Sequence, residues 1–266
     1  MNIIVCVKQV PGAASVEIDS ETGVLKREGA EAKLNPYDLF AIEAALTLAE
    51  STNGRVTAIS MGPPQARNAL LETIYMGVGQ AVLISDGLFA GSDVLATAFT
   101  LSQAVSAISK NSPNGFDLII CGKQTTDGDT AQVGPELAEF LDIPHATGVL
   151  SITPEDKGVV ALLGRDNNII KQYMPAPCLL CTDGGINTPR LPSYKRKREI
   201  TADPVQIMTV SDFGNQNTNN YGLKGSPTQV ERTFTPETSV GRETITGGSA
   251  RVADRLADIL AELKYI

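Results

Sequence analysis

The 266-residue sequence has no tryptophan, one histidine and four cysteines, and these scarcities exclude several kinds of site. His145 stands in IPHATG without partners for acid–base or nucleophilic work, so we expect an ordinary loop or strand residue. Cys178 and Cys181 have C-x-x-C spacing, but they fall in an apolar run typical of a strand, with no second pair to complete a zinc site. We therefore expect reduced, structural thiols and no metal ion.

Long apolar runs and excess positive charge are also missing. The longest apolar runs, such as 118–121, are too short to span a membrane, and the first residues lack the layout of a signal peptide. The formal net charge of −8 argues against binding to nucleic acid, and the basic run at 194–199 is expected to be a solvated face. We expect a soluble, cytoplasmic protein with no nucleic-acid partner and no membrane insertion.

Motifs of hydrolases and P-loop proteins are absent as well. The sequence contains no G-x-S-x-G, no H-E-x-x-H and no G-x-x-x-x-G-K-[ST]. We therefore expect no catalytic side chain. Any chemistry is expected to belong to a bound cofactor, which the protein positions.

The sequence does contain an alternation of short, β-rich apolar runs with helical patterns. Strands are expected at 2–10, 55–62, 80–86 and 116–122. Helices are expected from the N-cap Asn35 onward, at 64–75, at 92–108 and after the loop that begins at Cys121. Such alternation predicts an α/β fold with a doubly wound parallel sheet, in which ligands lie outside the carboxyl ends of the strands.

Three segments depart from this alternation. Residues 16–29 predict an inserted β-hairpin, and the residues after Pro144 form a β-rich extension. Residues 212–248 are rich in Asn, Thr, Gly, Pro and Ser, and they predict an extended C-terminal arm that ends in a helix. The apolar stripe of this helix needs a surface to cover, on this chain or on a partner. The stripe consists of Val252, Leu256, Ile259, Leu260 and Leu263.

The loop CGKQTTDGDTAQVGPE offers several groups for a ligand. Gly122, Gly128 and Gly134 let the backbone approach a ligand closely, and the free N–H groups expected at 129–133 attract phosphate. Asp127 and Asp129 oppose that attraction, so we expect them to face ribose hydroxyls or to lie outside the phosphate pocket. The same composition also fits a plain hydrophilic loop with a helix cap at Thr130.

Six motifs together resemble the β subunit of electron-transfer flavoproteins, in the order of that family and over nearly the whole chain. They are VCVKQVP, LNPYDLFAIEAAL, SMGPP, MGVGQAVLISD, CGKQTTDGDTAQVGPELAEFLDIP and LKGSPT. The resemblance implies a Rossmann-like, adenine-nucleotide-binding α/β domain at 1–192. It implies that 193–266 hold the end of a recognition loop and an arm that packs on an α subunit.

DGDTAQVGPE resembles the electron-bifurcating branch of the family, which holds FAD in this subunit. The resemblance implies that the chain accepts hydride from NADH and sends electrons to ferredoxin or flavodoxin. It also implies a second route, through the FAD of the α subunit to a dehydrogenase of the acyl-CoA or lactate type. The alternatives are a non-bifurcating β subunit that holds AMP, and an adenine-nucleotide-sensing module of another class.

The resemblance implies site residues by position. The cofactor-binding residues are Cys6, Lys8, Asn35, Pro36, Tyr37, Asp38, Met61, Gly122, Lys123, Gln124, Thr125, Asp127, Gly128, Asp129, Thr130, Ala131, Gln132 and Val133. Candidate residues for NADH are Phe89, Ala90, Gly91, Ser92, Asp93 and Thr97, although Ser92 and Asp93 also fit a plain helix cap. Leu191, in PRLPSYKRKRE, is the candidate anchor for a docked dehydrogenase.

Overall fold

The computed structural model describes residues 1–12, 17–18, 25–26, 32–231 and 244–265. Its contacts divide the chain into two units, Met1–Glu231 and Arg232–Ile266, and each is described by itself. Among the described residues, no helix combines the length and the apolar character needed to cross a membrane.

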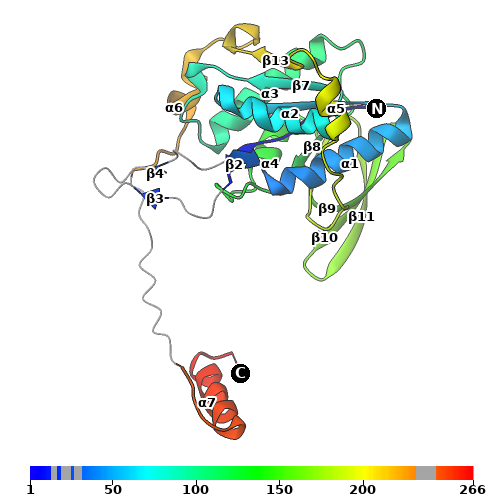
Figure 1. The fold of residues 1–266 in the computed structure, drawn as a ribbon. Helices are drawn as coiled ribbons and strands as arrows, with labels where there is room; N and C mark the ends of the chain where they lie inside the picture. The colour runs from blue at the N-terminus through cyan, green and yellow to red at the C-terminus, as the bar shows by residue number, and fades with distance from the viewer. Residues whose placement is uncertain (13–16, 19–24, 27–31, 232–243, 266) are drawn as a thin grey trace. The chain divides into compact units, whose positions relative to one another are not determined.

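Nine strands of the described chain form one sheet in the first unit, in the order β11-β10-β9-β12-β8-β1-β6-β7-β13 (Figure 1). Neighbours are parallel except at β9–β10 and β10–β11. Their bounds are β1 (Asn2–Cys6), β6 (Arg55–Met61), β7 (Gln80–Ile84), β8 (Leu118–Gly122), β9 (His145–Glu155), β10 (Gly158–Arg165), β11 (Asn168–Pro175), β12 (Cys178–Thr182) and β13 (Val205–Met208). The central strands are continuous apolar runs because both faces of a parallel sheet are covered.

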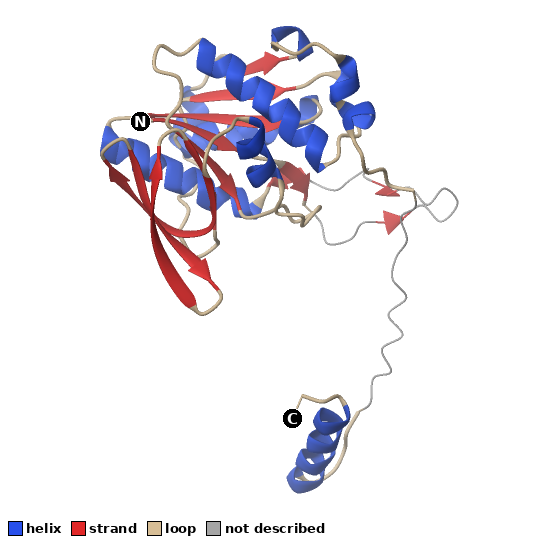
Figure 2. Cartoon of the chain, turned by 180° about the vertical axis from the view of Figure 1, so that it is seen from behind, coloured by secondary structure: helices blue, strands red, loops and turns tan. Residues whose placement is uncertain are grey.

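Helices cover both faces of the sheet, and successive strand residues point to opposite helical layers. One apolar cluster joins alternate strand residues to α1 (Pro36–Thr52) and α2 (Arg67–Met76), on the face seen in Figure 1. The other joins the intervening residues to α3 (Val94–Lys110) and α4 (Val133–Phe140), on the face seen in Figure 2. The α/β class and the mostly parallel central sheet predicted from the sequence are therefore confirmed.

The remaining short helices lie at the edges of the sheet and in the later part of the chain. They are η1 (Pro64–Ala66), η2 (Gly87–Phe89), α5 (Tyr194–Glu199), η3 (Val210–Asp212), η4 (Thr218–Asn220), α6 (Gly222–Gly225) and α7 (Ser249–Glu262). The helix expected at 64–75 is thus a 3-10 turn followed by α2. Two successive prolines at its start remove backbone donors there.

The strand order reverses next to β1, and this reversal places the site. The chain runs from β1 to β6 and β7 on one side, then returns through α3 to β8 on the other side. In open parallel sheets, ligands bind outside the carboxyl ends of the strands at such a switch point. The carboxyl ends of β1 and β8 are therefore where a ligand is expected.

The inserted segment contains two short antiparallel pairs. Strand β2 (Gln9–Pro11) pairs with β5 (Ala32–Leu34), and β3 (Glu17–Ile18) pairs with β4 (Leu25–Lys26). Residues 13–16, 19–24 and 27–31 lie outside the described residues. The hairpin expected at 16–29 therefore stays a prediction.

Residues 205–231 belong to the first unit, beyond the boundary expected at 192. Strand β13 extends the sheet beside β7, and Phe213 and Tyr221 are buried in an aromatic cluster with Phe89 and Phe99. These aromatic side chains stand among polar residues, so the segment looked like an arm in the sequence. Only the chain after Glu231 falls in the second unit.

The second unit contains α7, whose apolar stripe is only partly covered: Val252, Ile259 and Leu260 are half-buried. None of the residues of α7 is buried, and the side chains of Leu256 and Leu263 are 50% and 61% exposed. The stripe expected from the sequence thus remains available to another surface.

Candidate functional site

At the carboxyl ends of β1 and β8, the side chains of Asn35 and Asp38 join three segments of the chain. The Lys8 N–H donates to Asp38 Oδ2 at 2.7 Å, and Asn35 Nδ2 donates to Asp38 Oδ1 at 2.8 Å. Asn35 Nδ2 also donates to the Gln124 carbonyl at 2.9 Å, while Asn35 Oδ1 accepts from the Thr126 N–H at 3.3 Å. Asn35 occupies the N-cap position of α1, but its side chain bridges to the loop instead of capping the helix.

Asp38 is a buried carboxyl that ties the start of α1 to Lys8 and Asn35. Both of its oxygens accept hydrogen bonds from the chain, and the residue is 5% exposed. Burial raises the pKa of Asp38 from 3.8 to about 7, against the lowering effects of Asn35 and Lys8. The direct contact between this carboxylate and a nucleotide that the resemblance implies stays a prediction, and the structure shows Asp38 engaged with the chain itself.

Gly122, at the end of β8, lies against the start of α1. A Cβ at this position would overlap Asp38 Oδ1 and would lie 2.8 Å from the carbonyl carbon of Tyr37. Only glycine allows the loop after β8 to pass this close to Asn35–Asp38.

Charged and polar side chains of the loop after β8 pair with one another and with residues that follow β1 and β12. Lys8 Nζ lies 2.7 Å from Asp127 Oδ2, Lys123 Nζ lies 3.2 Å from Asp183 Oδ2, and the Gln124 side chain donates to Asp129. Partial burial raises the pKa of Asp127, but Lys8 lowers it by more, so its pKa lies below the ordinary value. Asp183 was not expected from the sequence, because it follows a different strand.

The backbone of the loop takes an uncommon conformation before α4. Asp129 and Ala131 have φ of 54° and 55°, and Gln132 follows in the right-handed region. A left-handed residue followed by a right-handed one turns successive N–H groups toward one concavity, which suits an anion. Left-handed non-glycine residues cost about 1–2 kcal/mol each and cluster at functional sites.

Helix α4 begins later than the sequence suggested. Its first residue is Val133 and its N-cap is Gln132, so Thr130 is not the cap. The first intrahelical acceptor is the Gln132 carbonyl, which bonds the Glu136 N–H at 3.0 Å, and Pro135 has no N–H. The amides at the start of α4 that have no helical acceptor are therefore those of Val133 and Gly134.

The comparisons with known proteins agree on one family. The family model described as electron transfer flavoprotein domain matches residues 22–212. The electron transfer flavoprotein subunit beta of Thermoanaerobacterium thermosaccharolyticum is 42% identical over 267 residues, which cover 98% of each chain. The protein of the same name from Clostridium acetobutylicum is 38% identical over 266 residues, and the caffeyl-CoA reductase-Etf complex subunit CarD of Acetobacterium woodii is 39% identical over 268 residues; both matches cover 100% of each chain.

This chain belongs to the electron transfer flavoprotein β-subunit family. Such proteins transfer electrons and bind a flavin or AMP, and the donors at this site fit the phosphate of either group. The amides of residues 131–134, the ammonium of Lys8 and the hydroxyls of Thr125 and Thr130 are donors, whereas Asp127 and Asp129 are acceptors suited to ribose hydroxyls. Cys6 and Met61 lie at the ends of β1 and β6, next to the same edge.

The segment proposed to bind NADH in this flavoprotein family is largely engaged in its own packing. The Phe89 ring is buried and stacks with Phe213 at 5.8 Å, so it is not on the surface. Asp93 caps α3 through the Ala96 N–H at 3.0 Å, and its other oxygen accepts from the Thr228 N–H and hydroxyl. The helix-cap interpretation of Asp93 is therefore confirmed, and among the six candidate residues the exposed ones are Ala90 and Gly91.

Glu136, in the first turn of α4, is a partly buried carboxyl near the site that the sequence did not indicate. Its Oε2 atom is buried without a hydrogen-bond partner in the described residues. Burial, together with the charge of Asp93, raises the pKa of this carboxyl. Asp93 and Glu136 thus bring the starts of α3 and α4 into electrostatic contact. An acidic residue in a first helical turn is too common to be noticed in a sequence.

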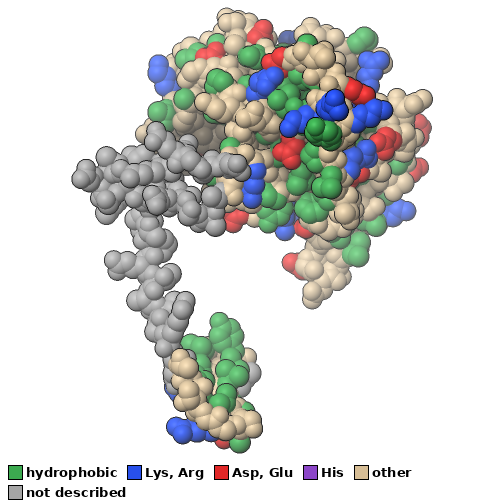
Figure 3. Space-filling model, viewed as in Figure 1, with side chains coloured by type: hydrophobic (Ala, Val, Ile, Leu, Met, Phe, Trp, Pro, Cys, Tyr) green, Lys and Arg blue, Asp and Glu red, His purple; other side chains and the backbone are tan. Residues whose placement is uncertain are grey.

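Leu191, the candidate docking residue, projects from a segment that is held firmly. It is 87% exposed. Its neighbour Arg190 bonds Glu43 through Nε at 2.8 Å and Glu50 through Nη1 at 2.7 Å, and the Ser193 N–H donates to the Tyr75 carbonyl at 2.9 Å. Lys and Arg side chains gather over the adjacent α5 (Figures 1 and 3).

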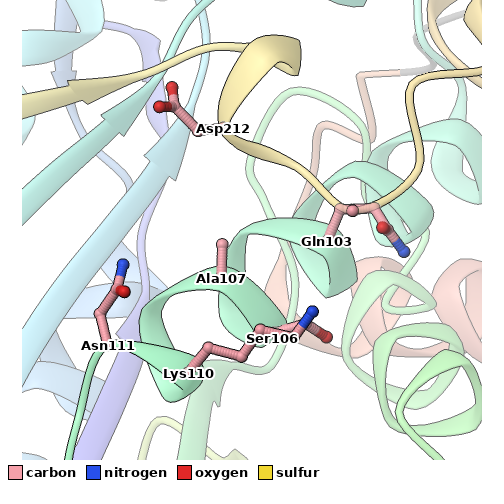
Figure 4. Close-up of a pocket in the computed structure, with 7 residues that line it drawn as sticks. Gln103, Ser106, Ala107, Lys110, Asn111 and Asp212 are labelled. Atoms are coloured by element: carbon pink, nitrogen blue, oxygen red, sulfur yellow. The ribbon is translucent and has the colours of Figure 1, made fainter.

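A separate small pocket of about 150 Å³ lies at the C-terminal end of α3 (Figure 4). Its lining residues, which include Gln103, Lys110 and Asp212, contain none of the predicted site residues. The carboxyl end of a helix and an aspartate both disfavour phosphate. This pocket therefore does not compete with the site at β1 and β8.

No group of three or more His, Cys, Asp or Glu in the described part of the chain could hold a metal ion. The cysteines are free thiols. Cys178 points to the α1/α2 face, whereas Cys181 points to the α3/α4 face, as expected for strand residues three apart.

Proposed function

We propose that this chain is the β subunit of a heterodimeric flavoprotein that takes hydride from NADH and divides the electrons between two acceptors. One route leads to ferredoxin or flavodoxin, and the other leads through the FAD of an α subunit to a dehydrogenase of the acyl-CoA or lactate type. FAD at the site of this chain would supply the exchange between two-electron and one-electron transfer. The full-length similarity to a subunit of a caffeyl-CoA reductase-Etf complex supports such a partner.

The observation that carries the proposal is the left-handed backbone before the amides at 131–134, in the loop whose Asp127 pairs with Lys8. Small side chains at Gly128 and Ala131 leave this backbone open, and the loop lies at the switch point of the sheet. Lys8 and these amides would hold a diphosphate, while Asp127 and Asp129 would orient ribose. Asp38 and Asn35 would hold the loop in place from beneath.

The remaining parts of the proposal concern partners and location. The apolar stripe of α7 and the chain after Glu231 would pack on the α subunit, because Leu256 and Leu263 of the stripe are exposed. Leu191, beside the basic residues of α5, would enter an apolar recess on the dehydrogenase. NADH would approach the segment at 89–97, where Ala90 and Gly91 are exposed. We propose a cytoplasmic location for the complex.

The test is the cofactor content of the heterodimer purified from its native source. We expect two FAD molecules per αβ pair, and oxidation of NADH when both acceptors are present. One FAD and one AMP per pair would overturn the bifurcating role and support a simple electron carrier. A colourless complex that contains only adenine nucleotide would instead support a nucleotide-sensing module.

A further inference from the structure

Three thiols lie in a row beneath the proposed cofactor site. Cys121 of β8 is the register partner of Cys6 on β1 and of Cys181 on β12. Neighbouring strands are about 4.8 Å apart, so register partners on one face touch. All three pack on the α3/α4 face of the sheet, in the same apolar cluster. These residues come from three distant parts of the sequence, so only the strand order reveals the row.

The row of thiols lies against the first turn of α4, next to Gly134. Cys6 precedes Lys8 by two residues, and Cys121 directly precedes Gly122. A Cβ on Gly134 would overlap Cys181 Sγ and would lie 3.7 Å from Cys121 Cβ. Movement of these sulfur atoms is therefore expected to displace both Lys8 and the backbone amides at the start of α4.

The three thiols differ in their access to oxidants. Cys6 is only partly buried, whereas Cys121 and Cys181 are 7% and 4% exposed. The Cys181 thiol lowers the pKa of Cys121, but a hydrogen bond with Cys6 and burial raise that pKa by more, so it lies well above its ordinary value. A hydrogen bond with Cys121 and burial likewise raise the pKa of Cys181. Cys6 is thus the thiol that a small oxidant meets first.

We propose that Cys6 and Cys121 form an oxidisable pair, which a peroxide converts into a disulfide on the floor of the cofactor site. The Cys6 thiolate attacks a peroxide oxygen; an S–O bond forms, the O–O bond breaks, and hydroxide leaves. The Cys121 sulfur then attacks the Cys6 sulfenic acid; an S–S bond forms, the S–O bond breaks, and water leaves with the Cys121 proton. Two thiols and one peroxide thus give one disulfide and two waters.

The strand geometry permits this bond but does not favour it strongly. Disulfides usually join Cα atoms about 4.4–6.8 Å apart, and adjacent strands lie near the short end of this range. Such a bond is strained and easily reduced. It also draws the two sulfur atoms to about 2.05 Å, which shifts the ends of β1 and β8 that carry Lys8 and Gly122. The pair is therefore suited to reversible oxidation.

Peptide mapping tests the pair directly. The full chain is treated with hydrogen peroxide, alkylated and digested with trypsin without reduction. Cys6 and Cys121 fall in separate single-cysteine peptides, 1–8 and 111–123, whereas Cys178 and Cys181 share 172–190. We expect 1–8 linked to 111–123, with the loss of two hydrogens. A link between 111–123 and 172–190, or no link at all, would overturn the proposal.

Matched variants separate the pair from general thiol oxidation. The link should be lost in Cys6→Ser and in Cys121→Ser, and it should form normally in Cys178→Ala, since Cys178 lies on the other face of the sheet. In Cys121→Ser, dimedone should trap sulfenic acid on Cys6. Circular dichroism of Cys6→Ser, which removes a partly exposed thiol, shows that a folded chain has lost the link. Faster oxidation of Cys178 than of Cys6 would contradict the proposal.

The expected effect of this disulfide on nucleotide binding rests on the proposed function, so it is tested in a separate experiment. Binding of AMP and of FAD is measured by equilibrium dialysis with reduced and with oxidised chain. We expect the Kd to rise about tenfold or more after oxidation of the wild type, and to return to its starting value when dithiothreitol reduces the disulfide. Equal affinity of the reduced and oxidised forms would defeat the regulatory effect. Failure of the reduced chain to bind either nucleotide would instead defeat the proposed function.

Discussion

At the scale of single residues, we expect substitution of Gly122 to destabilise the fold. In Gly122→Ala, the new methyl group would overlap Asp38 and would lie 2.8 Å from the Tyr37 carbonyl carbon. We expect a loss of about 1–3 kcal/mol in the free energy of unfolding, measured with urea, because the backbone must move. We also expect weaker nucleotide binding.

Gly185→Ala is the matched control, since no atom lies within 4 Å of a Cβ at that position. Its free energy of unfolding should stay within about 0.5 kcal/mol of the wild type. If Gly122→Ala behaved like this control, the close approach between the loop after β8 and the start of α1 would be refuted.

Because the pKa of Asp38 is raised in the folded chain, we expect the free energy of unfolding to fall as pH rises. This pKa is about 7 in the folded chain and 3.8 ordinarily. Between about pH 4 and pH 7 the folded chain therefore holds a proton that the unfolded chain has released. The free energy of unfolding should fall by up to about 1.4 kcal/mol per pH unit in this window, and the contribution is lost above the folded pKa. The charged groups that face Asp38 are Lys8 and Asp127.

Urea unfolding of wild type and Asp38→Asn across this pH window isolates the effect. Asn at this position cannot titrate, although its amide would face the amide of Asn35 and lower stability by a constant amount. We expect the wild type to lose stability relative to the variant as pH rises. A difference that is independent of pH would show that Asp38 is ionised throughout.

At the scale of secondary-structure elements, ion pairs of Arg190 hold the segment that carries Leu191 to helix α1. Arg190 bonds both Glu43 and Glu50, and Glu43 is largely buried. Arg190→Ala removes the charged partner of Glu43 and leaves it only the backbone N–H of residue 190 and the Thr47 hydroxyl, so we expect a loss of about 2–4 kcal/mol in stability, measured by chemical denaturation.

Lys195→Ala provides the comparison for Arg190. The Lys195 side chain is 85% exposed and pairs with Glu199 at 3.9 Å, so its removal should change stability by less than about 0.5 kcal/mol. Docking of a dehydrogenase should weaken in Arg190→Ala and in Leu191→Ala, but only the first variant should unfold more easily. Equal stability of the two variants would contradict the role assigned to Arg190.

Sequence patterns predicted the elements well where apolar periodicity was long, and poorly where tertiary contacts decide the structure. The central strands and α1–α4 follow from such patterns. The bridge between Asn35 and Gln124 could not be predicted, because Asn35 also reads as an ordinary helix cap. The packing of 205–231 was hidden because Phe213 and Tyr221 stand among polar residues without a period. The thiol row depends on strand order, which local patterns do not determine.

For the complete chain, the exposed stripe of α7 predicts how the subunits assemble. Leu256→Asp places a charge in the stripe, and burial of a leucine side chain is worth about 1.5–3 kcal/mol. We expect the Kd for the α subunit to rise tenfold or more, measured by sedimentation of the mixed subunits. The unit Met1–Glu231 should unfold as before, since α7 lies outside it.

Ala261→Asp is the control for assembly, because residue 261 lies on the side of α7 opposite the stripe. It introduces the same charge into the same helix and should leave the Kd nearly unchanged. Equal weakening by both substitutions would indicate that loss of helix, and not loss of the apolar face, separates the subunits.

The rigid attachment of the segment between β12 and β13 is expected to affect how fast docked partners exchange. The segment leaves the sheet beside β9 and rejoins it beyond β7, and on the way it is tied to α1 by Arg190 and to α2 by Ser193. Little conformational freedom remains for a docked protein to remove, so association should be close to rigid-body encounter. Residence times are then expected to be short at a given affinity, which suits the proposed electron carrier.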